Sequence, residues 1–267
     1  MRGAIADTCA ALALLVGVAT AHAAAPAACR GTLYLSFDTG HMEPASAIAD
    51  ILARHHVRAT FFIANERTKR GGHTLDDSER AFWQRLVAEG HAFGSHTWEH
   101  AYFRGDVGAD GVRYVPAGQA SGAGRVLDRT AVCAEIARPE ARFRELTGRG
   151  FDGIWRAPGG RTTPRLLDYA QSCGWTHIGW SDAGFLGDEL PSERYPNAVL
   201  LERAVARLRD GDILMAHLGI WSRREPFWPM LDPLIERLQA KGFCFATLSE
   251  RGKRQPAPPR AATTGAP

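Results

Sequence analysis

Short apolar runs alternate with segments of helical periodicity along most of the 267-residue chain. The runs at 32–37 and 59–64 are rich in strand-forming residues. Between them, Ile48, Ile51 and Leu52 recur at the spacing of one helix face. This alternation repeats about seven times, which predicts an α/β fold whose parallel sheet is closed or nearly closed into a barrel.

One segment breaks the alternation. Residues 101–127 are rich in Gly, Asp and Ala and follow neither the helical nor the strand period. We expect an irregular loop inserted into the fold there, and long loops in compact domains are often functional.

The beginning of the chain has the composition of a secretory signal peptide. Arg2 precedes an apolar stretch at 10–19, and small residues at 21–23 suit a cleavage site. The stretch is shorter than the roughly 20 apolar residues that a membrane-spanning helix needs. We therefore expect residues 1–23 to be removed, leaving an exported protein, periplasmic or secreted, with no transmembrane segment.

The end of the chain and the overall charge point away from other classes. Residues 250–267 are rich in Pro, Arg, Ala and Thr, which predicts a disordered tail after a domain spanning 30–249. The net charge is only +3, and no basic groove with interleaved aromatic residues is visible. These observations argue against nucleic acid as a partner.

Four cysteines remain once the leader, with Cys9, is removed. An even number in an oxidising compartment predicts disulfides, and four cysteines allow three pairings. Cys29 precedes the first predicted strand and Cys244 lies in the last. We expect these two to pair, which leaves Cys133 with Cys173; four buried free thiols are the alternative.

Polar residues of reactive types follow four of the predicted strands. They are Asp38, His96, Arg156 and His217, and His100 comes four residues after His96. In an α/β barrel the carboxyl ends of the strands meet at one rim. Two imidazoles at this spacing can bind one metal ion. Each residue alone has an ordinary structural role, but together they predict a catalytic site.

The segments around these residues resemble the motifs of the NodB-type polysaccharide deacetylases, carbohydrate esterase family 4. The motifs occur in the family's order over nearly all of the mature length. They are Ser36-Phe37-Asp38-Thr39-Gly40, His96-Thr97-Trp98-Glu99-His100, Arg156-Ala157-Pro158-Gly159-Gly160 and Met215-Ala216-His217.

This resemblance implies a distorted (β/α) barrel and metal-dependent removal of N-acetyl groups from a glycan. By the same resemblance, Asp38 is the general base and Arg156 orients it, while His217 is the general acid. His96 and His100 are metal ligands. The expected ion is divalent, zinc first, with cobalt or nickel as alternatives.

The metal motif departs from the family's pattern at Thr39, where the family has an aspartate as third ligand. A neutral hydroxyl is a weaker ligand than a carboxylate. Three explanations remain open: another side chain substitutes, with His41 as first candidate, water fills the position, or the metal is absent. We favour a retained metal, because both histidines, the base and the acid are kept.

Other positions differ in ways that bear on the substrate. Gly159 replaces an aromatic residue of the family's groove, and its backbone N–H is expected to hold the oxyanion. Met215 replaces a leucine in the wall that receives the acetyl methyl group, a mild change. Trp180 is a candidate for stacking on a sugar, and Asp182 is the nearest match to the acidic residue that tunes His217.

These features predict an exported hydrolase that deacetylates an N-acetylated polysaccharide, of exopolysaccharide, peptidoglycan or chitin-like type. Two alternatives remain. One is a related C–N hydrolase acting on a small amide, and the other is a catalytically inactive glycan-binding protein of the same fold. Thr39 keeps both open, whereas the signal peptide favours a glycan and the presence of Asp38 and His217 favours catalysis.

Overall fold

A computed structural model of the chain describes residues 29–117 and 124–251. The predicted signal peptide lies outside the described residues, as does the predicted tail apart from its first two residues. Among the described helices, none is long and apolar enough to cross a membrane.

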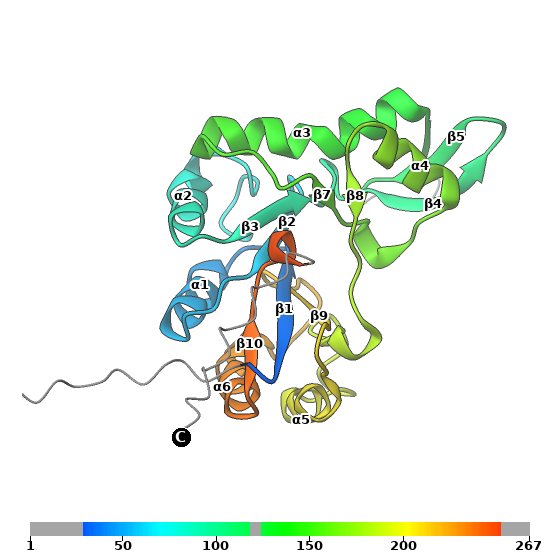
Figure 1. The fold of residues 1–267 in the computed structure, drawn as a ribbon. Helices are drawn as coiled ribbons and strands as arrows, with labels where there is room; N and C mark the ends of the chain where they lie inside the picture. The colour runs from blue at the N-terminus through cyan, green and yellow to red at the C-terminus, as the bar shows by residue number, and fades with distance from the viewer. Residues whose placement is uncertain (1–28, 118–123, 252–267) are drawn as a thin grey trace, which may run out of the picture.

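The centre of the molecule is a curled sheet of seven parallel strands that forms a half-barrel (Figure 1). The predicted α/β fold with about seven parallel strands is thereby confirmed. The spatial order is β9-β1-β2-β3-β7-β8, and β10 pairs with the amino end of β1. The strands are β1 (Gly31–Asp38), β2 (Thr60–Ile63), β3 (Ala92–Ser95), β7 (Ile154–Trp155), β8 (Thr176–His177), β9 (Ile213–His217) and β10 (Phe243–Phe245).

The barrel is distorted because β8 and β9 do not pair as neighbouring strands in the described structure. The chain that follows β8 instead touches β9 through an isolated bridge between Phe185 and Met215. A hydrogen bond from Ser181 N to Ile213 O adds a second contact. The irregular chain after β8, in place of a strand, therefore completes this side of the half-barrel.

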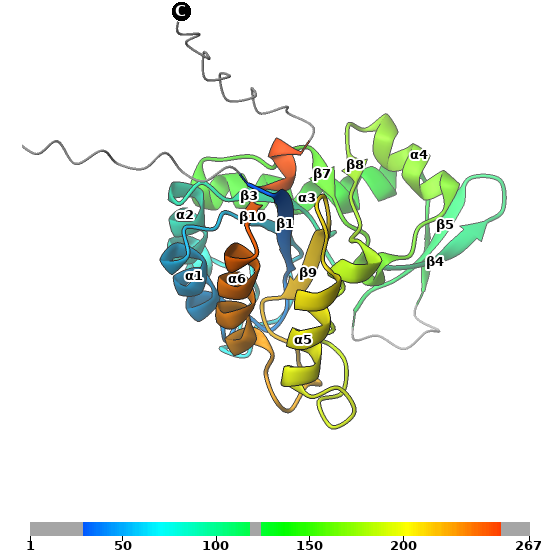
Figure 2. The same cartoon turned by 60° about the horizontal axis from the view of Figure 1, so that its bottom comes forward.

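Six helices cover the outside of the curled sheet (Figures 1 and 2). Local sequence fixes the starts of two of them, the helices that begin at Arg129 and Pro164. The Asp128 side chain accepts a hydrogen bond from Ala131 N at 2.8 Å. Thr163 precedes a proline at the first helical position. The helices are α1 (Ala45–Arg54), α2 (Arg80–Ala88), α3 (Arg129–Thr147), α4 (Pro164–Ser172), α5 (Asn197–Arg207) and α6 (Leu231–Ala240).

The alternation of side chains along β1 separates the core from the site. Leu33, Leu35 and Phe37 are fully buried in the main apolar cluster, together with residues of α1 and α6. Burial of each such side chain contributes about 1.5–3 kcal/mol. Successive strand residues point to opposite faces, so Ser36 and Asp38 point into the interior of the half-barrel.

The inserted segment is a small antiparallel sheet, and the prediction of an irregular loop was wrong. It comprises β4 (Tyr102–Val107), β5 (Gly111–Val115) and β6 (Arg125–Leu127). Buried Phe103 and Tyr114 join it to a second apolar cluster beneath α3 and α4. The strands are short and contain glycines and charged residues, so tertiary packing stabilises them where local periodicity is absent.

Two disulfides close the structure, Cys29–Cys244 and Cys133–Cys173, as the sequence predicted. The first joins the start of the first strand to the last strand. The second joins α3 to the residue that follows α4. Both fit a protein that folds in an oxidising compartment.

Candidate active site

Strand register brings the predicted residues to one rim. Asp38 and His217 are direct partners at the ends of β1 and β9. Ser95 and Trp155 are partners at the ends of β3 and β7, so the residues that follow them, His96 and Arg156, lie level with each other. A cavity of about 280 Å³ opens at this rim, lined by Asp38, His96, His100, Tyr102, Gly159, Trp180, Glu189, Met215 and His217.

The Asp38 carboxylate is held from inside the barrel by Arg156. The guanidinium donates from Nη1 to Asp38 Oδ1 at 2.8 Å and from Nη2 to Ser36 Oγ at 2.9 Å. It also donates to the carbonyls of Ile178 and Gly179 and lies 4.0 Å above the Phe62 ring. Every face of this buried cation is thus occupied, and its position is fixed.

The protonation state of Asp38 follows from these contacts. Burial raises its pKa, but the positive charge of Arg156, helped by His96 and His217, outweighs burial and holds the pKa below its usual value. Asp38 is therefore a carboxylate at neutral pH. One oxygen is anchored on Arg156, and Oδ2 lies 3.6 Å from His96 Nε2, at the cavity.

His96 and His100 are brought together by an irregular turn and not by a helix. Thr97 and His100 have φ values of 66° and 51°, in the left-handed region that non-glycine residues seldom adopt. The two rings lie with centroids 4.9 Å apart. Backbone strain of this kind often occurs at functional sites, where the fold holds side chains in a required arrangement.

The two imidazoles fit a divalent metal ion. His96 Nδ1 donates to Arg156 O at 3.0 Å, which leaves Nε2 as a lone-pair donor facing the cavity. Burial, chiefly, lowers the His96 pKa to about 3, so the ring is neutral, the form that binds metals. His100 Nδ1 is buried and has no hydrogen-bond partner among the described residues.

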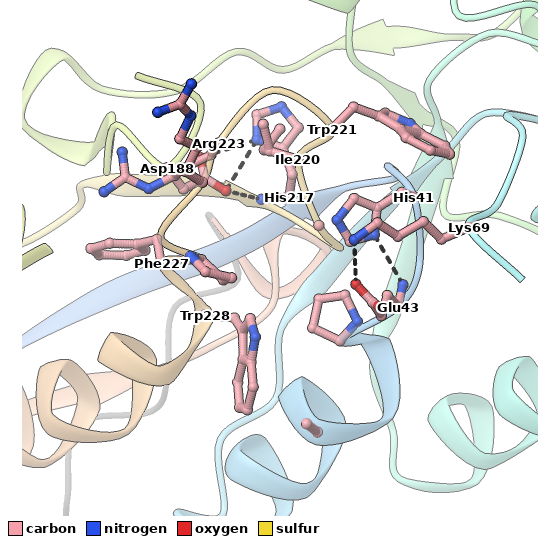
Figure 3. Close-up of a pocket in the computed structure, with 15 residues that line it drawn as sticks. His41, Glu43, Lys69, Asp188, His217, Ile220, Trp221, Arg223, Phe227 and Trp228 are labelled. Carbon is pink, nitrogen blue, oxygen red and sulfur yellow. Dashed lines mark hydrogen bonds and ion pairs between the residues drawn. The ribbon is translucent and has the colours of Figure 1, made fainter. Parts of the chain in front are cut away.

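The third ligand position is less complete. Within the described residues no three His, Cys, Asp or Glu side chains are grouped closely enough to hold an ion as placed. Thr39 Oγ1 donates to Glu66 Oε1 at 2.7 Å. His41 lines a different cavity, of about 340 Å³, beside Glu43 and Lys69 (Figure 3). The structure therefore does not bring His41 together with His96 and His100.

His217 is supported by an aspartate that the sequence analysis missed. Its Nδ1 lies 3.1 Å from Asp188 Oδ1, and its backbone N donates to Asp188 Oδ2 at 2.7 Å (Figure 3). We expected Asp182 in this role, but Asp182 begins a short 3-10 turn and is exposed. The chain between β8 and α5 is irregular, so sequence spacing could not show which acidic residue would turn toward His217.

The charge of His217 is set by its carboxylate neighbours. Burial lowers the imidazole pKa, but the charge and hydrogen bond of Asp188, with Asp38 and Glu189, outweigh burial and raise it to about 9. His217 is therefore protonated at neutral pH. Because Nδ1 is directed at Asp188, Nε2 faces the cavity, 3.8 Å from Glu189 Oε2.

Comparison with known proteins identifies the family of this chain. The sequence model described as "Polysaccharide deacetylase" matches residues 26–178, more than half of the chain. The chain belongs to the polysaccharide deacetylase family. The matched segment contains Asp38, both histidines and Arg156, whereas His217 lies beyond its end.

Individual relatives agree with the family. A chitooligosaccharide deacetylase of Azorhizobium caulinodans is 25% identical over 224 residues, covering 84% of this chain and 90% of that protein. A family 4 acetyl xylan esterase from Clostridium thermocellum, in complex with a cobalt ion, has a TM-score of 0.62 at 23% identity, covering 82% of this chain and 89% of that one. A family 4 pseudoenzyme from Bacillus anthracis has a TM-score of 0.60 at 18% identity, covering 85% of this chain and 66% of that one. The two structures share the fold with this deacetylase-family chain.

The inserted sheet contributes a residue to the family's site. At Gly159, with φ of 65°, an added Cβ would lie 3.4 Å from the ring of Tyr102, the first residue of β4. The Tyr102 ring also packs edge-on against His100, with centroids 5.0 Å apart. The Tyr102 ring thus lies directly beside Gly159, and the sequence analysis did not select it.

The remaining predicted residues line the same cavity. Met215 is buried and forms an apolar part of the wall, and Trp180 is half-buried beside Gly160. Glu189, which the sequence analysis did not select, contributes a second carboxylate opposite Asp38. The cavity thus combines acidic, basic and apolar surfaces at one rim.

Proposed function

We propose that this chain is an exported, metal-dependent hydrolase that removes N-acetyl groups from an N-acetylated polysaccharide. The observation that carries the proposal is the pairing of Asp38 and His217 at one cavity, the first a carboxylate and the second protonated at neutral pH. Positioned groups of opposite protonation state are what hydrolysis of an amide needs. The family and its chitooligosaccharide-deacetylating relative support the substrate class.

His96 and His100 are the residues that would hold the ion. A divalent metal held there would polarise the acetyl carbonyl and lower the pKa of a bound water toward about 7. We favour zinc, the usual ion for imidazole ligands in hydrolases, with cobalt or nickel as alternatives. The cobalt ion in the related esterase supports a divalent ion.

Asp38 accepts the proton of the attacking water. Arg156 holds Oδ1, so Oδ2 is the oxygen that faces the cavity and takes the proton. Water oxygen forms the new bond to the acetyl carbon. Positioned bases of this kind contribute about 10²–10⁴-fold in rate.

His217 donates a proton to the departing amine as the C–N bond breaks. Asp188 orients the imidazole through Nδ1 and keeps it charged, so that Nε2 carries the proton into the cavity. The products are acetate and a free amine on the sugar. The Gly159 N–H stabilises the oxyanion, and Met215 receives the acetyl methyl group.

The test is acetate release from N-acetylglucosamine oligomers by chelator-stripped protein, with and without added zinc, cobalt or nickel. We expect activity only with metal, and its loss in Asp38→Asn and His217→Gln. Asp110→Asn and His56→Asn, at exposed positions away from the cavity, are matched controls and should retain activity.

The alternatives give different results in the same experiment. Calorimetric binding of the oligomers without acetate release, for every metal, would indicate a catalytically inactive glycan-binding protein; the fold has at least one neighbour described as a pseudoenzyme. If the protein neither binds the oligomers nor releases acetate from them, but releases acetate from small N-acyl amines, it is the small-amide hydrolase. Either outcome would overturn the proposed activity.

A further inference from the structure

Two imidazoles alone make an incomplete catalytic metal site, because such sites generally use three protein ligands. Carboxylates near His96 and His100 are the obvious third donors. Asp38 is bonded to Arg156, and Glu99 is bonded to Tyr114 and Arg125. Two carboxylates remain at the rim, those of Glu66 and Glu189.

We propose that Glu66, positioned by the hydroxyl of Thr39, is the third protein ligand of an ion bound by His96 and His100. The inference rests on the proposed function for the presence of the ion. It assigns to this chain a ligand that the motif position itself, occupied by Thr39, does not provide.

The hydrogen bonds of Thr39 direct it toward Glu66. Ala64 N donates to Thr39 Oγ1 at 3.0 Å, so the hydroxyl hydrogen is free to point elsewhere. It is donated to Glu66 Oε1 at 2.7 Å. The carboxylate is thereby held next to the residue that follows Asp38, at the carboxyl ends of β1 and β2.

The backbone of Glu66 is fixed as well. Glu66 N donates to Thr74 Oγ1 at 3.2 Å, and Thr74 N donates to Glu66 O at 2.9 Å. Only the side-chain torsions of Glu66 are therefore free. Rotation about them moves the carboxylate without any change in the surrounding fold.

The second oxygen of Glu66 is available to a ligand. Across 29–117 and 124–251, no cation forms an ion pair with Glu66, and Oε2 has no hydrogen bond. Glu66 shares a cavity of about 870 Å³ with His100 and Tyr102. The Tyr102 ring in turn packs edge-on against His100, with centroids 5.0 Å apart. Glu66 is thus on the histidine side of the rim.

Glu189 lines the catalytic cavity together with both histidines, but its carboxylate is placed toward His217. Its carboxylate lies 3.8 Å from His217 Nε2, and its side chain is 46% exposed. The charge of Glu189 therefore acts mainly on the imidazolium that donates the proton. As placed, Glu66 accepts from Thr39 and does not form a three-ligand group with the histidines, so ion binding turns its side chain toward them.

The test measures metal affinity without substrate. Zinc is titrated calorimetrically into the chelator-stripped full chain, and cobalt binding is followed by its visible absorption. We expect Glu66→Gln to lower affinity by more than the roughly 10–100-fold that loss of a supporting hydrogen bond produces. We also expect it to change the cobalt spectrum, since a ligand is lost. Glu189→Gln tests the competing carboxylate and should bind zinc as the parent chain does, and Asp110→Asn, at an exposed position of the β4–β5 turn, is the control.

A charge swap distinguishes a ligand from a structural role. In Thr39→Asp/Glu66→Gln a carboxylate is returned to the rim from position 39, and we expect most of the lost affinity and the parent cobalt spectrum to return. Circular dichroism of each metal-free variant checks that the fold is kept. Glu66→Asp, with a shorter side chain, provides a second variant that preserves the charge and should weaken binding less than Glu66→Gln.

The inference is overturned if Glu66→Gln binds both metals like the parent chain, or if Glu189→Gln shows the loss instead. Absence of metal binding by the parent chain would also overturn it. Because these measurements need no deacetylation, their outcome is separate from that of the proposed function. A chain that binds metal through Glu66 and releases no acetate would contradict only the latter.

Discussion

The two sides of the cavity differ in how completely their polar atoms are bonded within the protein. On the Asp38 side, Arg156 donates to a carboxylate, a hydroxyl and two carbonyls, and the cation is fully buried. On the His100 side, a buried ring nitrogen has no partner in the described structure, and Glu66 has one bonded oxygen. On the first side the protein itself fixes the cation and one carboxylate oxygen and leaves Asp38 Oδ2 at the cavity, whereas the second side has the donors to receive a metal ion.

The largest expected effect separates chemistry from metal binding. Asp38→Asn should lower kcat for acetate release by about 10²–10⁴-fold, because the amide cannot accept the proton of water. The variant should still bind zinc, because Asp38 is engaged with Arg156 and not with the ion. Acetate assay and zinc titration on the same preparation check this. Loss of zinc binding in Asp38→Asn would show that the two sides are not separate.

The second prediction compares how much each side of the cavity contributes to the free energy of unfolding. Arg156→Leu should lower the free energy of unfolding by about 3–5 kcal/mol, since it leaves the Asp38 carboxylate buried and unpaired. On the other side, His100→Asn should cost less than about 1 kcal/mol, because His100 Nδ1 has no hydrogen bond to lose and asparagine tolerates its left-handed backbone. Urea denaturation of metal-free protein at pH 7 measures both. Equal losses would contradict the contrast.

The third prediction tests the support of His217. With its pKa raised to about 9, the protonated form should sustain activity up to about pH 9. Asp188→Asn should move this basic limb of the kcat profile toward 6.5, the ordinary value for histidine. A profile whose basic limb does not move would exclude Asp188 as the group that tunes His217.

The same pair has a stability signature. Because the folded pKa is raised, the stabilisation from Asp188 is fully present below about pH 6.5 and is lost as pH rises through about 9. The difference in unfolding free energy between the parent chain and Asp188→Asn should shrink over that range. A pH-independent difference would indicate that the aspartate acts only through its bond to the His217 backbone N–H.

The smallest effect concerns the inserted sheet. Tyr102→Ala should raise KM for the oligomers by about 2- to 12-fold, which corresponds to the 0.5–1.5 kcal/mol of an aromatic contact. Tyr102→Phe keeps the ring and should be close to the parent chain. A similar loss in both variants would mean that the hydroxyl, not the ring, contributes to substrate binding.

The side of the cavity formed by Asp38 and Arg156 is also the side that the sequence could predict. Asp38 and Arg156 each follow an apolar strand, and parallel strands place their carboxyl ends together, so local pattern was sufficient. Glu66, Tyr102 and Asp188 lie in connections or in the inserted sheet. Their positions depend on contacts between segments distant in sequence, as between Asp188 and His217, and no local period encodes such contacts.

The sheet β4–β6 was missed for a related reason. Its strands are short, and only Phe103, Val112 and Tyr114 form a buried face against α3 and α4. A register shift between Phe103 and Gly105 further obscures the period of β4. The parallel strands β2 and β9, by contrast, are buried on both faces over nearly all of their length and appear in the sequence as nearly continuous apolar runs.

The Cys29–Cys244 bond makes the described fold a covalent ring, which changes what proteolysis can do. A single cut anywhere between the two cysteines, for example at the exposed β4–β5 turn at 108–110, leaves every residue attached to one molecule. A non-reducing gel would then show one band, and reduction, which breaks both disulfides, would release two fragments wherever the single cut falls. Such a ring retains its strands after a nick and keeps them at high effective concentration for re-pairing.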